Sequence, residues 1–153
     1  MRLVAAGTRM PAWVDAGFRD YADRLHGDYR LVLTEIPLGD RSSGDVRRAV
    51  EAEGKRMLAA AGDRAYLVAL QVGGRSLSTR DLARWLEDRA REGDAPVFCI
   101  GGPDGLAPEV DAGARLRWSL SALTLPHALA RVVVAESLYR AVSLIKGLPY
   151  HRA

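Results

Sequence analysis

The sequence has 153 residues, of which 48% are apolar and 27% are charged, and its formal net charge is only +3. A chain of this length and composition can bury most of the surface that its unfolded form exposes, so we expect one compact domain over residues 1–153. The single cysteine, Cys99, excludes an internal disulfide and a multi-cysteine metal site, and no apolar run approaches membrane-spanning length.

The first half of the chain alternates short apolar runs with helical patterns. Residues 3–6 form an apolar run that predicts a strand, and apolar side chains at helical spacing over residues 14–25 predict a helix after it. The pattern then repeats, because residues 31–36 read as a strand and residues 46–61 show helical spacing before Gly62. Two successive strand and helix units are therefore predicted.

The second half continues the alternation. Residues 65–70 predict a strand, and Ser-Thr-Arg-Asp at 78–81 resembles a capping box at the start of a helix. Residues 96–100 are apolar throughout, as expected for a strand that is covered on both faces. The remaining predicted elements are a short helix near residues 108–114, a last strand at 117–120 and a long apolar helix that includes residues 132–145.

This alternation predicts the α/β class, with a mostly parallel sheet and helices on both of its faces. Such sheets bind ligands in a crevice outside the carboxyl ends of their strands. We therefore expect function in four segments that follow strands or end the chain. They are residues 71–76, 101–105, 121–127 and 149–152.

The two loops in the middle of this set suit a nucleoside-like ligand better than a triphosphate. The sequence has neither a P-loop motif nor a G-x-G-x-x-G fingerprint at its first helix. Gly101 and Gly102 let a ligand approach the backbone, although Pro-Asp-Gly is also an ordinary turn. Leu120, Leu123 and Leu125 could supply aliphatic walls for a flat ring such as adenine, with core packing as the alternative.

The last helix and the tail hold the polar residues best suited to act on a substrate. Glu136 and Arg140 are four residues apart and share a helix face, which is also typical of a surface ion pair. Tyr150, His151 and Arg152 combine a stacking ring, a titratable imidazole and a guanidinium. This set can contact RNA and move a proton, and a frayed terminus without function is the alternative.

The other histidines do not indicate a metal site. We expect His26 to cap carbonyl groups at the end of the first helix, and His127 to have a structural role at the head of the last one. Neither H-x-x-H nor H-E-x-x-H spacing occurs, so no metal is expected.

The basic residues indicate which partners are possible, and the N-terminal residues indicate where in the cell the protein acts. Of the 22 basic residues, 20 are Arg and 2 are Lys, which permits an anionic partner without requiring one. The apolar stretch at the N-terminus is too short for the core of a signal peptide. We therefore expect a cytoplasmic protein that does not bind membranes.

Four segments together resemble one family closely. They are GTRMPAWV at residues 7–14, IGGPDGL at 100–106, WSLSALTLPHALARVVVAESLYRA at 118–141 and PYHR at 149–152. In this order they resemble the small bacterial methyltransferases that modify N3 of pseudouridine in large-subunit (23S) ribosomal RNA, members of the SPOUT superfamily. The resemblance spans nearly the whole chain. Asp104, where the family often has Glu, and Ala128, where Pro is common, are small departures.

The resemblance implies a C-terminal trefoil knot, S-adenosylmethionine as the cofactor, and a homodimer that acts on assembled 70S ribosomes. The knot follows from the family alone, because general rules of chain topology disfavour threaded chains. The implied cofactor-binding residues lie in three loops: Leu70, Gly101, Gly102, Gly105, Leu120, Ser121, Ala122, Leu123, Thr124 and Leu125.

The resemblance also implies that Glu136, Arg140, Tyr150, His151 and Arg152 lie on the substrate side. Methyl transfer to a ring nitrogen depends mainly on alignment, and a base that removes the N3 proton assists it. His151 is the first candidate base, because the reference pKa of histidine is about 6.5, and Glu136 is the second. Arg140 or Arg152 could stabilise charge on the flanking carbonyl oxygens, and Tyr150 could stack on the base.

Two other functional classes stay open at this point. A non-catalytic ribosome-binding assembly factor of the same fold would have a packed crevice and would not bind S-adenosylmethionine. A flavodoxin-like binder of nucleotides or flavin would need a phosphate-cradling first loop, which the motif pattern argues against.

Overall fold

A parallel sheet of five strands forms the centre of the molecule. The computed structural model describes residues 1–151 and, of His151, only the backbone. The strands are β1 (Arg2–Ala6), β2 (Val32–Ile36), β3 (Tyr66–Ser76), β4 (Pro96–Ile100) and β5 (Leu116–Ser119), in the spatial order β2-β1-β4-β3-β5. Each pair of neighbouring strands is parallel, which confirms the predicted sheet.

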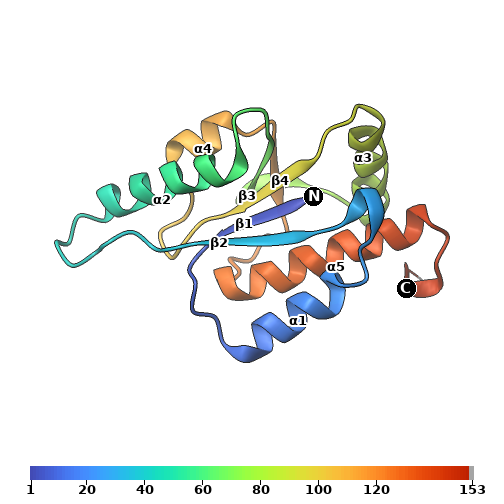
Figure 1. Ribbon diagram of the computed structural model, residues 1–153, viewed down its shortest axis with the longest axis horizontal. Coiled ribbons are helices and arrows are strands. Elements are labelled where there is room, and N and C mark those ends of the chain that lie inside the picture. The colour runs from blue at the N-terminus through green and yellow to red at the C-terminus, as the bar shows by residue number, and fades with distance from the viewer. Residues whose placement is uncertain (152–153) are drawn as a thin grey trace.

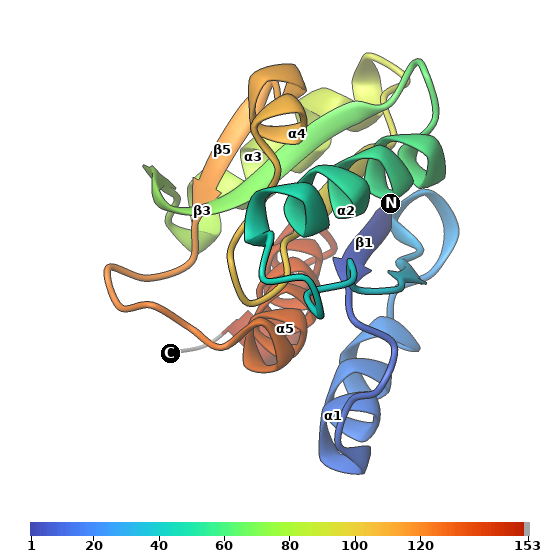
Figure 2. The same ribbon diagram turned by 90° about the vertical axis from the view of Figure 1, so that its left-hand side faces the viewer.

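Helices cover both faces of this sheet, as predicted (Figures 1 and 2). Two of them, α2 (Val46–Ala61) and α4 (Pro108–Gly113), pack on one face. The other three, α1 (Ala12–Ala22), α3 (Thr79–Arg91) and α5 (His127–Ile145), pack on the opposite face. Helix α5 therefore lies under the sheet with α1 and α3 beside it.

Strand β1 shows how the sheet separates two apolar cores. Leu3 and Ala5 point into the core shared with α1, α3 and α5, whereas Val4 and Ala6 point into the core shared with α2 and α4. All four side chains are fully buried. The period of two along a strand places alternate residues on opposite faces, so a continuous apolar run indicates a strand covered on both sides.

Helix α5 is apolar on most of its sides because it is buried from several directions. Ala135, Leu138 and Ala141 are inaccessible to solvent, and α5 packs against both α1 and α3. Gly17 of α1 allows the close approach, since a Cβ atom at this position would lie 3.2 Å from a methyl group of Val132. These contacts fix the position of α5 under the sheet.

Strand β3 is longer than predicted, and the expectation of a loop at residues 71–76 is wrong. The strand continues to Ser76, with a shift in its pairing to β5 between Leu70 and Arg75. Gly74 makes this possible, because a Cβ atom there would lie 2.8 Å from the backbone of Arg117. The adjacent glycines look like strand breakers, yet they permit a bulge and a close backbone approach.

The first helix ends earlier than its apolar pattern predicts. Leu25 is buried but lies beyond α1, which ends at Ala22. His26 is not in the last turn of this helix, where we expected it to cap carbonyl groups. It lies in extended backbone before a short 3-10 helix, η1 (Gly27–Tyr29), that leads into β2.

The last described residues lie beside α5. A second 3-10 helix, η2 (Pro149–His151), turns back against α5. Within residues 1–151, no helix has the length and apolar character needed to cross a membrane. The predicted trefoil knot concerns the path of the chain through its own loops, which strand order does not define, and it stays a prediction.

Candidate functional site

A crevice of about 330 Å³ opens at the carboxyl ends of β3, β4 and β5. Nine of the ten predicted cofactor residues line it: Leu70, Gly101, Gly102, Gly105, Leu120, Ser121, Leu123, Thr124 and Leu125. Ala122 is exposed and does not belong to the lining. Leu70 of β3 and the two predicted loops after β4 and β5 therefore meet at one place, as the parallel order of the strands requires.

The loop after β4 presents its backbone to the crevice. Gly105 has a φ of +87°, and its amide donates a hydrogen bond of 3.1 Å to the carbonyl oxygen of Gly102. A Cβ atom at Gly101 would overlap the backbone of Gly105. Only glycine fits this close turn, and the result is a lining that exposes peptide groups and little side chain.

The loop between β5 and α5 supplies apolar walls. The Ser119 hydroxyl donates to the carbonyl oxygen of Ser121 at 3.0 Å, and the Ser121 hydroxyl accepts from the amide of Leu123 at 2.9 Å. These bonds tighten the start of the loop, while the Leu123 side chain is 74% exposed at its tip. Trp118 is buried beneath, so the crevice has an aromatic floor and aliphatic sides.

His127, for which we expected a structural role, also lines the crevice. Its position at the first residue of α5, directly after the loop, is the signal that could have found it. Burial lowers the pKa of His127, and the charge of Arg131 lowers it further against an opposing effect of Glu53. The imidazole is therefore neutral near pH 7 and can both donate and accept a hydrogen bond.

Arg131 holds the start of α5 in place. Its side chain is fully buried and forms an ion pair of 2.5 Å with Glu35 of β2. It also donates to the carbonyl oxygens of Ala6 and Gly7 at the end of β1, at 3.0 and 2.6 Å. Because Arg131 follows His127 by one helical turn, this anchor fixes the wall of the crevice that His127 forms.

The predicted substrate-side residues form a second cluster along α5. Glu136 Oε1 accepts from Arg140 at 2.8 Å and from the hydroxyl of Tyr150 at 3.1 Å. The Tyr150 ring packs 4.7 Å from that of Tyr139 and 6.4 Å from that of Tyr21. Burial and the neighbouring Tyr21 and Glu136 side chains raise the pKa of Tyr150, which keeps its hydroxyl a donor.

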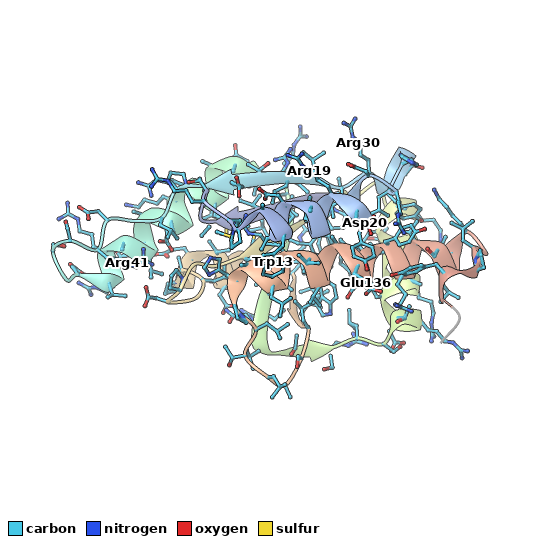
Figure 3. All side chains as sticks on the ribbon, turned by 90° about the horizontal axis from the view of Figure 1, so that it is seen from below. Trp13, Arg19, Asp20, Arg30, Arg41 and Glu136 are labelled. Atoms are coloured by element: carbon cyan, nitrogen blue, oxygen red, sulfur yellow. The ribbon has the colours of Figure 1, made fainter. Side chains whose placement is uncertain are left out.

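Two of the predicted substrate-side residues are described only in part or not at all. His151 belongs to η2, so its backbone follows Tyr150 next to α5, whereas its side chain lies outside the description. Arg152 also lies outside the described residues. Figure 3 shows Glu136 on the face where α1 and α5 lie side by side, with Trp13 and Asp20 of α1 on the same face.

The crevice and the second cluster lie at different places along α5. A rise of 1.5 Å per residue places Glu136 about 14 Å along α5 from His127. Within residues 1–151, no group of three or more histidine, cysteine, aspartate or glutamate side chains could hold a metal ion. The site thus consists of an apolar crevice with peptide donors and acceptors, and a polar cluster on the same helix.

The parallel α/β sheet with a crevice at the carboxyl ends of its strands agrees with the fold that the sequence segments implied. The chain belongs to the SPOUT methyltransferase family, because the family model described as "Predicted SPOUT methyltransferase" matches residues 1–151. This membership confirms the resemblance and makes the chain a methyltransferase.

Two relatives match this chain over nearly the full length of both proteins. The chain is 53% identical over 154 residues to a protein of Alkalilimnicola ehrlichii, covering 100% of this chain and 99% of the relative. It is 52% identical over 153 residues to a protein of Thiobacillus denitrificans, covering 99% and 98%. Both relatives are named "Ribosomal RNA large subunit methyltransferase H".

Solved structures share the fold at low identity. A methylase family protein from Neisseria gonorrhoeae matches with a TM-score of 0.54 and 18% identity, over 90% of this chain and 80% of that one. TrmJ from Z. mobilis matches with a TM-score of 0.51 and 17% identity, over 92% and 69%. These likenesses support the fold and nothing finer.

Proposed function

We propose that the chain transfers a methyl group from S-adenosylmethionine to N3 of a pseudouridine in large-subunit ribosomal RNA. The observation that carries this proposal is the full-length identity of 53% to a protein named "Ribosomal RNA large subunit methyltransferase H". The match covers 100% of this chain and 99% of the relative.

The residues of the crevice fit S-adenosylmethionine. Its volume of about 330 Å³ lies within the range of ligand clefts, and its lining includes neither lysine nor arginine. Leu120 and Leu125 supply aliphatic faces for an adenine ring, and the peptide groups of Gly101 and Gly102 supply partners for polar edges. When bound, the cofactor supplies a methyl group made electrophilic by its sulfonium.

The polar cluster on α5 has the chemistry to receive and orient the base. Arg140 is fixed by Glu136, so its guanidinium can stabilise charge that develops on a carbonyl oxygen beside N3. Glu136 Oε1 already accepts hydrogen bonds from Arg140 and Tyr150, which supports a positioning role for this carboxylate. His151 is therefore the residue that we assign to removal of the N3 proton.

The distance between the two clusters supports a composite site in a homodimer. Along α5, Glu136 lies about 9 Å and Arg140 about 15 Å from Ala130, the last residue of this helix that lines the crevice, so the two sets do not meet at one point of a single chain. In a two-fold dimer, the crevice of one protomer can face the cluster of its partner. The tail residues Tyr150, His151 and Arg152 would then complete the site of the other protomer.

The ribosome is the partner that this proposal requires, and we expect the chain to act in the cytoplasm. We expect the single domain of residues 1–153 to read the shape of the assembled 70S particle through arginine contacts to phosphate. Ribosome binding should then weaken steeply as salt rises, because displaced counterions dominate such contacts. Binding that does not change with salt would contradict this account of recognition.

The direct test is transfer of labelled methyl from S-adenosylmethionine to ribosomes that lack the modification. We expect label on a pseudouridine of the large-subunit RNA in 70S particles. The control is Thr124→Trp, in which an indole would occupy the crevice that Thr124 lines. Cofactor binding without label on any ribosomal particle would overturn the proposed substrate and leave the methyltransferase fold intact.

A further inference from the structure

The cofactor loop after β4 is supported from behind by the segment between β2 and α2. A Cβ atom at Gly102 would lie 2.9 Å from the Leu38 side chain and 3.0 Å from Glu53 Oε2. The next residue of α2, Gly54, leaves room for Ala107, which a Cβ atom there would overlap. The loop is thus packed against α2 and residue 38 on one side and exposes its backbone to the crevice on the other.

The guanidinium of Arg41 connects the loop after β4 with helix α2 and with the segment between β2 and α2. Arg41 lies between β2 and α2 (Figure 3) and donates from Nε to Asp104 Oδ2 at 2.9 Å. Its Nη2 lies 2.8 Å from the same oxygen. Its Nη1 donates to Glu53 Oε1 at 2.8 Å and to the carbonyl oxygen of Gly39 at 3.0 Å.

The buried carboxylate explains why Arg41 has a fixed position. Glu53 is 3% exposed, its Oε1 also accepts from the Gly39 amide at 2.8 Å, and its Oε2 has no hydrogen-bond partner within residues 1–151. Burying a carboxylate is costly unless a cation neutralises it, so Arg41 is held against Glu53. Hydrogen bonds to Glu53 and Asp104 raise the pKa of Arg41, which keeps the guanidinium charged.

We propose that Arg41 and Asp104 are positioning residues that hold the Gly101–Gly105 loop in the shape that binds the cofactor. This inference rests on the proposed use of S-adenosylmethionine in the crevice. Asp104 lies in the loop, between Gly102 and Gly105 of the lining, but its carboxylate faces Arg41. A charge-assisted bond to a guanidinium that cannot move fixes the loop before any ligand arrives.

Asp104→Asn is the informative variant, because it weakens the bond to the loop and leaves Arg41 to neutralise Glu53. Arg41→Ala is not suitable, since it would leave Glu53 charged, buried and unpaired. Asp104→Glu retains the carboxylate and is the conservative variant. Asp88→Asn removes a comparable exposed partner, that of Arg91 on α3, and is the matched control.

The first measurement is calorimetric binding of S-adenosylmethionine to the intact protein, beside its thermal unfolding. We expect Asp104→Asn to weaken binding about five- to tenfold, consistent with the loss of one charge-assisted hydrogen bond. Its melting temperature should stay close to that of Asp88→Asn, and Asp104→Glu should bind as the wild type does. Methyl transfer at saturating cofactor should be nearly unchanged, because the loss is in KM and not in kcat.

The second measurement needs no cofactor. Hydrogen–deuterium exchange of the loop amides at residues 101–106 should be faster in Asp104→Asn than in the wild type and in Asp88→Asn. Unchanged exchange and unchanged affinity in Asp104→Asn would overturn the positioning role. A wild-type protein that fails to bind S-adenosylmethionine would instead overturn the proposed function, and the exchange result would still decide whether Arg41 and Asp104 hold the loop.

Discussion

Tyr150 has contacts within the protein that its residue type alone does not predict. The sequence indicates an aromatic ring in a tail suited to RNA. In the structure this ring lies against Tyr139 and its hydroxyl donates to Glu136. Tyr21, far away in the sequence, completes the aromatic cluster. Tyr150 therefore docks the tail on α1 and α5, and stacking on a substrate base would require the ring to leave this place.

Removing only the Tyr150 hydroxyl should separate docking from cofactor binding. Tyr150→Phe keeps the ring contacts and deletes the hydrogen bond to Glu136, so the tail should be less well positioned. We expect kcat/KM for the ribosome to fall about three- to tenfold, which corresponds to one net hydrogen bond. Calorimetry should show wild-type affinity for S-adenosylmethionine. An equal loss of cofactor affinity would mean that Tyr150 supports the crevice and not the tail.

The sequence predicted the position of His127 at the head of the last helix, but it did not indicate that this residue lines the crevice. The pattern Pro-His before an apolar helix suggested a structural role. Only the fold shows that the first residue of α5 lines the same crevice as β3 and the loop after β4. A sequence motif cannot report this, because the crevice is built from segments that are distant along the chain.

The lowered pKa of His127 predicts how stability depends on pH. The unfolded chain takes up a proton near pH 6.5, whereas the folded protein resists protonation of this imidazole until lower pH. The stability from neutral His127 is thus complete above about pH 6.5 and is lost as pH falls below it. In His127→Gln, the free energy of unfolding should fall less between pH 7.5 and pH 5 than it does in the wild type. Urea unfolding at pH intervals of about one-half unit measures this difference. An identical slope in both proteins would contradict a buried neutral imidazole.

At the scale of elements, periodicity predicted the strands at β1, β2 and β4 and the alternation of the sheet. It did so because β1 and β4 are almost entirely apolar runs, β2 is rich in apolar and β-branched residues, and the helices have regular apolar faces. It failed at β3, where Gly73 and Gly74 indicated a loop. The strand continues through them because its partner β5 approaches closely at Gly74. Such a contact depends on pairing across the sheet and leaves no local pattern.

The two glycines of β3 provide a matched pair for a stability test. A Cβ atom at Gly74 would lie 2.8 Å from the backbone of Arg117, whereas nothing lies within 4 Å of the same atom at Gly73. Gly74→Ala should lower the free energy of unfolding by about 1–3 kcal/mol, because β5 must move. Gly73→Ala should be neutral or slightly stabilising, by up to about 1 kcal/mol. Equal effects in chemical denaturation would contradict the close β3 and β5 pairing.

At the scale of the whole molecule, helix α5 connects two sets of groups that a single protomer keeps apart. His127 lies at the crevice, and Glu136 binds Arg140 and the tail about 14 Å further along the helix. The resemblance implied both sets of residues, but their separation is visible only in the structure. The separation is the physical reason to expect that two copies of the chain share each active site.

Mixed dimers test this claim most directly. Thr124→Trp should block the crevice, and His151→Ala should remove the base, so each homodimer should be inactive on 70S ribosomes. After unfolding and refolding the two variants together, heterodimers should contain one intact composite site. About a quarter of wild-type methyl transfer should then return, because half of the dimers are mixed and each has one of two sites. No recovery of activity in dimers shown to be mixed would contradict the composite site.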